Sequence, residues 1–186
     1  MYYDEQRKLA FVLPSKTGST ALEHFFKLWG VQSLSTNRHM FYDDALNAKP
    51  ELATYKTYGF FRDPLDRFLS ICRYIYIMNN QYCSETNGYP DNIYDRYLDT
   101  FPNKLLPQSY LGAKQVAWLK NAELLDYKNY EMEILKVARM FEQTKVTMVK
   151  ANETPPCDVV PSQRVIDFVQ SYYEDDYRLA KERRLG

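Results

Sequence analysis

Short, largely apolar runs alternate with segments of mixed polarity along the chain. Such runs are typical of buried strands, and their alternation with helical patterns favours a parallel sheet. The predicted strands are Leu9 to Leu13, Tyr55 to Phe61, Val116 to Leu119 and Val146 to Val149. The pattern therefore predicts an α/β fold, a single domain over residues 1–186 with a central parallel sheet flanked by helices.

Helical periodicity follows the first predicted strand after a short polar turn. Leu22, Phe25, Phe26 and Trp29 recur at i, i+3, i+4 and i+7, and Gly30 follows where a helix would stop. The first unit is therefore expected to be a strand, a tight turn and a helix.

Three further helices are expected. Pro64 suits the first turn of a helix whose apolar residues fall on one side. Another helix is predicted from about Lys128 to Phe141, and the last from Pro161 into the charged segment 181–184.

The charge balance limits the classes of partner. The 24 basic and 24 acidic residues of this 186-residue chain cancel, so no overall field favours nucleic acid or an anionic membrane. The run Leu9 to Leu13 is too short to span a bilayer and has no signal-peptide pattern around it. We expect a soluble protein with neither nucleic acid nor membrane as a partner, whose anion-binding site is local.

The cysteines bear on the cellular compartment. Cys72, Cys83 and Cys157 are odd in number and form no CxxC pair, which argues against a disulfide framework and a zinc site. The simplest expectation is a cytoplasmic protein without a bound metal.

The first candidate motif lies between the first predicted strand and its helix, in the run Pro14-Ser-Lys-Thr-Gly-Ser-Thr20. Amide groups at a helix N-terminus bind anions, Gly18 lets the backbone approach a ligand, and Ser19 and Thr20 add hydroxyl donors. The run is not a Walker loop, because Lys16 precedes the glycine. On its own it also suits an ordinary helix cap with an exposed lysine.

The second candidate motif follows the second predicted strand. Arg62 comes at the strand end, and Ser70 lies two turns into the next helix, so both side chains can reach one phosphate. An arginine can bond two phosphate oxygens at once, which a lysine cannot. The alternative is a capped helix with a solvated polar side.

Together the two motifs resemble the cofactor-binding loops of sulfotransferases that use 3'-phosphoadenosine 5'-phosphosulfate (PAPS). The run Lys16, Thr17, Gly18, Ser19, Thr20 resembles the loop that binds the 5'-phosphosulfate, and Arg62 with Ser70 resembles the 3'-phosphate signature. The resemblance implies a fold like that of the P-loop kinases. It also implies that Lys16 stabilises charge on the departing phosphate.

The chain resembles the carbohydrate (Golgi-type) sulfotransferases over most of its length, without a membrane anchor. Such enzymes often carry a histidine before the second strand, which implies His39 as the general base. Glu23 is the reserve candidate, because some relatives use a glutamate. His24 is expected to be a surface or packing residue of the first helix.

The expected function is sulfuryl transfer from PAPS to an acceptor hydroxyl, on a small molecule or an oligosaccharide, by in-line displacement. One alternative is a kinase-like, nucleotide-dependent phosphotransferase, although the sequence has neither a Walker lysine nor a convincing acidic strand end for magnesium. Another is a module that binds the nucleotide without catalysis. The acceptor and the oligomeric state are not encoded in any recognisable pattern.

Overall fold

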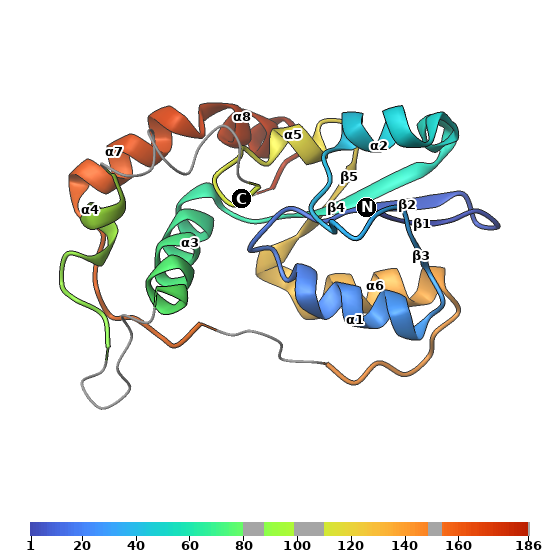
Figure 1. Ribbon diagram of the computed structural model, residues 1–186, viewed down its shortest axis with the longest axis horizontal. Helices are drawn as coiled ribbons and strands as arrows, with labels where there is room; N and C mark the ends of the chain where they lie inside the picture. Colours follow the sequence, from blue (N-terminus) through green and yellow to red (C-terminus); the bar gives the residue numbers. More distant parts are fainter. Residues whose placement is uncertain (80–87, 99–109, 149–153, 186) are drawn as a thin grey trace.

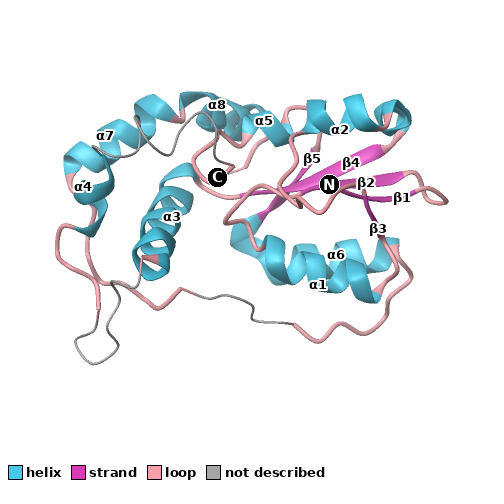
Figure 2. Ribbon diagram, in the orientation of Figure 1, coloured by secondary structure: helices cyan, strands magenta, loops and turns pink. Residues whose placement is uncertain are grey.

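The computed structural model describes residues 1–79, 88–98, 110–148 and 154–185. These residues form one small α/β domain built on a mixed sheet with strand order β3-β1-β2-β4-β5 (Figure 2). The strands are β1 (Tyr2–Asp4), β2 (Leu9–Val12), β3 (Gln32–Ser33), β4 (Lys56–Phe61) and β5 (Glu123–Asp126). The α/β class is confirmed.

The expectation of a wholly parallel sheet is wrong at one edge. Strands β2, β4 and β5 are parallel, but β1 is antiparallel to both β2 and β3. A short turn joins β1 to β2 as a hairpin, in which Tyr2 pairs with Phe11. Because β1 and β3 are only three and two residues long, neither produces an apolar run in the sequence.

Helices cover both faces of the sheet (Figure 1). Helices α1 (Ser19–Leu28) and α6 (Tyr130–Met140) lie on one face, and α2 (Tyr42–Ala48) and α5 (Val116–Leu119) lie on the other. Successive strand side chains point to opposite faces, so Phe11 packs in the core under α1 and Val12 in the core beside α5. This two-sided burial explains the continuous apolar run of β2.

A third core lies beyond the end of the sheet. It joins α3 (Pro64–Met78), α4 (Ile93–Leu98) and α7 (Gln163–Tyr172), and α8 (Glu174–Glu182) leads back to α5 (Figure 1). Short 3₁₀ turns at Pro50–Thr54 and Tyr127–Asn129 precede β4 and α6. No helix in the described ranges has the length and apolar character that crossing a bilayer requires.

The helix predictions are largely confirmed. The helix after the first strand ends at Leu28, and Asp63 caps α3 by accepting the Asp66 amide at 3.0 Å, with Pro64 in its first turn. Helix α6 lies within the predicted range. The expected last helix is two helices, α7 and α8, which meet at Tyr173.

Two strand predictions are corrected. The run Val116–Leu119 is helix α5, because the buried carboxylate of Asp176 accepts the amides of Gln115 and Val116 at 2.8 and 2.9 Å and so caps a helical turn. Residues 146–148 form no strand, and residue 149 lies outside the described residues. The strand that pairs with β4 on the side away from β2 is β5, whose sequence Glu-Leu-Leu-Asp carries too few apolar residues to stand out.

Candidate functional site

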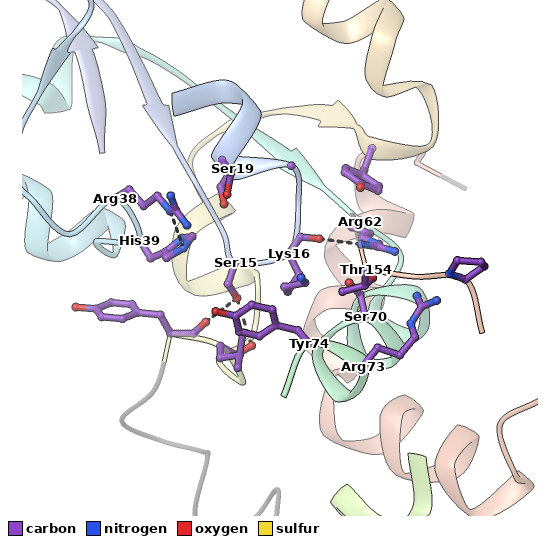
Figure 3. A pocket seen from close by; sticks show the side chains of 16 residues that line it. Ser15, Lys16, Ser19, Arg38, His39, Arg62, Ser70, Arg73, Tyr74 and Thr154 are labelled. Carbon is purple, nitrogen blue, oxygen red and sulfur yellow. Dashed lines mark hydrogen bonds between the residues drawn. The ribbon is translucent and has the colours of Figure 1, made fainter. Parts of the chain in front are cut away.

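A cavity of about 970 Å³ opens at the carboxyl-terminal edge of the parallel strands. The loop after β2 and the segment after β4 both contribute to it, because parallel neighbours end at the same edge. Its charged lining residues are Lys16, Arg38, Arg62 and Arg73, and the described lining includes no carboxylate. The charged side chains that line this cavity are therefore cationic, which favours negative charge within it (Figure 3).

The loop between β2 and α1 has a constrained backbone. Lys16 and Gly18 adopt left-handed conformations, with φ of 62° and 76°. A Cβ on Gly18 would come within 2.5 Å of the Tyr130 ring, and the Tyr130 hydroxyl donates to the Gly18 carbonyl at 3.0 Å. Gly18 is therefore required by this close packing as well as by the turn. A left-handed lysine costs about 1–2 kcal/mol, which the rest of the fold must offset.

Lys16 projects into the cavity (Figure 3). Its ammonium lies 4.4 Å from the centroid of the Tyr74 ring. Burial, together with the charges of Arg62 and Arg73, lowers the pKa of Lys16 to about 8. An anion bound beside it would reverse this effect and favour the charged ammonium.

The main chain of Arg62 is held by hydrogen bonds to Gln115, and its side chain lines the cavity. The Gln115 side chain accepts the Arg62 amide at 3.0 Å and donates to the Arg62 carbonyl at 2.7 Å. Nη1 donates to the Lys16 carbonyl at 3.0 Å, and the guanidinium carbon lies 4.6 Å from the Tyr127 ring centroid. Burial lowers the pKa of Arg62, and in the described structure its buried Nε has no hydrogen-bond partner. A buried donor of this kind can be satisfied by a bound water or ion.

Helix α3 adds three side chains to the same cavity. Ser70, Arg73 and Tyr74 lie at i, i+3 and i+4, so they share one face of the helix. Figure 3 shows Ser70 and Arg73 on the Arg62 side of Lys16, together with Thr154. The structure thus brings Arg62 and Ser70, eight residues apart, to one wall of the cavity.

The remaining residues of the first motif divide between two environments. Gly18, Ser19 and Thr20 line the cavity with Lys16. Thr17 does not, because its buried hydroxyl donates to the Pro14 carbonyl at 2.8 Å. In this conformation the side chain of Thr17 therefore does not reach the predicted cofactor site.

His39 lies across the cavity from Arg62 (Figure 3). Its Nδ1 lies 2.7 Å from the Leu13 carbonyl, which fixes the proton on Nδ1 and leaves Nε2 as an acceptor. Nε2 accepts a hydrogen bond from Arg38 Nε at 3.2 Å. Burial lowers the pKa of His39, Arg38 lowers it further, and the Leu13 bond opposes them. A neutral imidazole with an acceptor nitrogen is the form that a general base needs.

Glu23, the reserve base, lies in an ion-paired cluster outside the described cavity lining. Its carboxylate contacts Arg38 Nη1 at 2.6 Å and Lys27 Nζ at 2.9 Å. Burial would raise the pKa of Glu23, but hydrogen bonds from Arg38, Lys27 and Tyr2 outweigh it and bring the pKa to about 2. So weak a base is a poor proton acceptor. His24 is exposed on α1, as expected.

Several residues that line or support the cavity were not among the predicted site residues. Arg73 could have been found from its i+3 spacing to Ser70, but Arg38, Tyr127 and Thr154 reach the cavity from unrelated segments. Arg67, behind the loop, donates to the Ser15 carbonyl and hydroxyl, both at 2.9 Å, and so supports the loop from the interior.

Comparison of the chain with protein-family models gives no match. Comparisons with curated proteins and with solved structures also give none. Any functional assignment therefore depends on the residues and geometry of the cavity.

Proposed function

We propose that this chain is a sulfotransferase that moves the sulfuryl group of PAPS to an acceptor hydroxyl, on a carbohydrate. The observation that carries the proposal is the convergence of the two motif segments, joined by the 3.0 Å bond from Arg62 Nη1 to the Lys16 carbonyl. That contact places the lysine loop and the arginine segment on one cationic cavity.

The donors of the cavity fit a nucleotide with phosphates at both ends. Lys16, Ser19 and Thr20 at the start of α1 suit the 5'-phosphosulfate. Arg62, with its unpartnered Nε, and Ser70 suit the 3'-phosphate, with Arg73 beside them.

The proposed mechanism is in-line displacement. Bound PAPS would supply the sulfuryl group, and the acceptor oxygen would bond to its sulfur as the bond from sulfur to the bridging phosphate oxygen breaks. His39 accepts the hydroxyl proton at Nε2 and becomes an imidazolium, which its bond to Leu13 holds in orientation. The Lys16 ammonium neutralises the charge that develops on the bridging oxygen.

A kinase-like phosphotransferase has less support in the cavity. Such enzymes hold magnesium with an acidic side chain near the nucleotide phosphates. Asp126 ends β5, but its two oxygens accept from Lys128 N at 2.9 Å and Asn129 Nδ2 at 2.8 Å, and it does not line the cavity. Its carboxylate serves the turn before α6.

Isothermal titration with three nucleotides tests the proposal. We expect 3'-phosphoadenosine 5'-phosphate (PAP) to bind more tightly than AMP, which lacks only the 3'-phosphate, and more tightly than magnesium ATP. Arg62→Met should weaken PAP binding by roughly 10- to 100-fold and leave AMP binding nearly unchanged, because charged hydrogen bonds contribute about 1.5–3 kcal/mol.

Arg178→Met is the matched control. Arg178 is exposed on α8 and pairs with Asp175 away from the cavity, so both affinities should stay as in the wild type. Clear binding of magnesium ATP without binding of PAP would contradict the proposal. Binding of PAP without transfer from PAPS to any oligosaccharide or phenol in a panel would favour the non-catalytic module.

A further inference from the structure

The cations of the cavity fall into two groups on either side of Lys16. Arg62 and Arg73 are the charges that act on Lys16, whereas Arg38 acts on His39. Figure 3 shows the same division, with Arg38 and His39 on one side and Arg62 and Arg73 on the other. The cavity therefore has two separate positive regions.

The proposed cofactor accounts for only one of them. The motif residues assigned to its two ends are Lys16 at the 5' end and Arg62 with Ser70 at the 3'-phosphate. Arg38 belongs to neither motif, and among the described lining residues it is the cation on the His39 side. That side is where the acceptor hydroxyl must lie if His39 takes its proton.

The contacts of Arg38 leave part of its guanidinium for a ligand. Nη1 is anchored to Glu23 at 2.6 Å, and Nε reaches His39 Nε2 at 3.2 Å. The side chain is nevertheless 34% exposed and lines the cavity. Since Glu23 also pairs with Lys27 at 2.9 Å, the three side chains together keep a net positive charge.

The hydrogen bond from Arg38 to His39 determines whether the imidazole nitrogen is available as a base. As long as Arg38 Nε donates to Nε2, the lone pair that should accept the hydroxyl proton is occupied. An anion that binds the guanidinium competes for this donor and can draw it away from the imidazole. Binding of such an anion would therefore release the base.

We infer that Arg38 selects acceptors that carry an anionic group, a carboxylate or a sulfate, close to the hydroxyl that is sulfated. This inference rests on the proposed sulfotransferase function. In the reaction the hydroxyl proton moves to His39 Nε2, the acceptor oxygen bonds to sulfur, and the electron pair of the broken bond stays on the bridging oxygen of PAP. Arg38 contacts the anion and takes no part in the proton transfer.

The test compares three acceptors with the same ring and aglycone: 4-nitrophenyl β-glucoside, the matching β-glucuronide, and the glucoside 6-sulfate. We expect kcat/KM for at least one anionic acceptor to exceed that of the neutral glucoside by about tenfold or more, from one charged hydrogen bond. A preference for the glucuronide identifies a carboxylate, and one for the 6-sulfate identifies a sulfate. Equal values for all three acceptors overturn the inference.

Two variants test which arginine causes the preference for an anionic acceptor. In Arg38→Gln the ratio of anionic to neutral kcat/KM should fall toward one, whatever happens to the absolute rates. Arg73→Gln removes a cation from the other side of the cavity and should weaken PAP while keeping the ratio. A ratio that survives Arg38→Gln, or that falls equally in Arg73→Gln, overturns the assignment to Arg38.

A binding measurement distinguishes failure of this inference from failure of the proposed function. Saturation-transfer NMR on the PAP-loaded protein measures the same acceptor preference without turnover. If PAP binds and no anionic acceptor is preferred in either assay, the inference alone fails. If PAP does not bind, the proposed function fails, and the inference fails with it.

Discussion

Two arginines contact the β2–α1 loop, Arg67 from its interior side and Arg62 from its cavity side, and they differ in burial and in their partners, because Arg67 is buried and Arg62 is half-buried. Arg67, on the interior side, donates to the Ser15 carbonyl, the Ser15 hydroxyl and the Ala113 carbonyl, each at 2.9 Å. Arg62, on the cavity side, bonds the Lys16 carbonyl through Nη1, while its Nε has no partner in the described structure. Burial of a charge alone does not mark a binding site, whereas a donor without a partner beside a cavity can be satisfied by a bound water or ion.

The largest expected effect comes from the interior side. Arg67→Met removes the side-chain donor to the Ser15 and Ala113 carbonyls and a charge that acts on the buried carboxylate of Asp176. We expect the free energy of unfolding to fall by about 3–5 kcal/mol, as when one partner of a buried ionic network is removed. Urea denaturation followed by circular dichroism measures this loss.

Arg62→Met is the matched comparison on the cavity side. Its removal loses one hydrogen bond but also relieves the burial of a charge, so the stability should change by no more than about 1 kcal/mol. Equal losses in the free energy of unfolding for Arg67→Met and Arg62→Met would mean that Arg62 contributes as much to stability as Arg67.

The next largest effect is expected at His39, which contacts the interior and also lines the cavity. Its Nδ1 contacts the Leu13 carbonyl in the interior, and its Nε2 accepts from Arg38, which lines the cavity. We expect His39→Asn to lower the rate of sulfuryl transfer by roughly 10²- to 10⁴-fold, the usual contribution of a general base. The affinity for PAP, measured by titration, should stay the same, and unchanged turnover would remove His39 from the mechanism.

The direction of the His39 pKa shift predicts the acid limb of the wild-type rate. Because burial lowers the pKa of His39, the imidazole stays neutral down to a pH below its usual value of about 6.5. Activity should therefore be lost only below about pH 6.5 as the ring becomes protonated. A midpoint above that value would contradict the assignment.

The smallest effect concerns the proton of Lys16. Its pKa of about 8 in the free protein means that the ammonium is present below pH 8 and is lost as the pH rises through 8. PAP needs the charged form, so its affinity should be constant below that pH and fall by up to about tenfold per pH unit above it.

Lys16→Arg is the control for this dependence, because arginine stays protonated throughout. Its affinity for PAP should be flat between about pH 7 and about pH 9.5. Titration in buffers of different ionisation enthalpy should show proton uptake by the wild type above pH 8 and none by the variant. Proton uptake of equal size in both would assign the effect to another group.

The sequence predicts the parts of this fold whose signals are local. Helices α1 and α3 have an apolar period and clear boundary signals, Gly30 after the first and Pro64 at the start of the second. The hairpin strand β1 and the edge strand β3 are too short to produce a period. The run Val116–Leu119 is equally apolar as a strand or a helix, and its state is decided by Asp176, 60 residues away along the chain.

The sequence likewise predicts only those residues of the candidate site whose signals are local. Lys16, Arg62 and Ser70 are readable because each motif is continuous in sequence and follows a strand. Arg38 and Gln115 are not, because their importance depends on contacts with Glu23 and Arg62, 15 and 53 residues distant. Short motifs locate two segments that line the cavity, whereas the groups that orient them are brought in by the tertiary structure.

The double hydrogen bond between Gln115 and the main chain of Arg62 has a consequence for the order of assembly. Gln115 is itself fixed by Asp176, so α8 at one end of the chain supports the arginine that follows β4. During synthesis the β2–α1 and β4–α3 segments leave the ribosome long before α8 does. A growing chain therefore completes this wall of the cavity only after Asp176 has emerged.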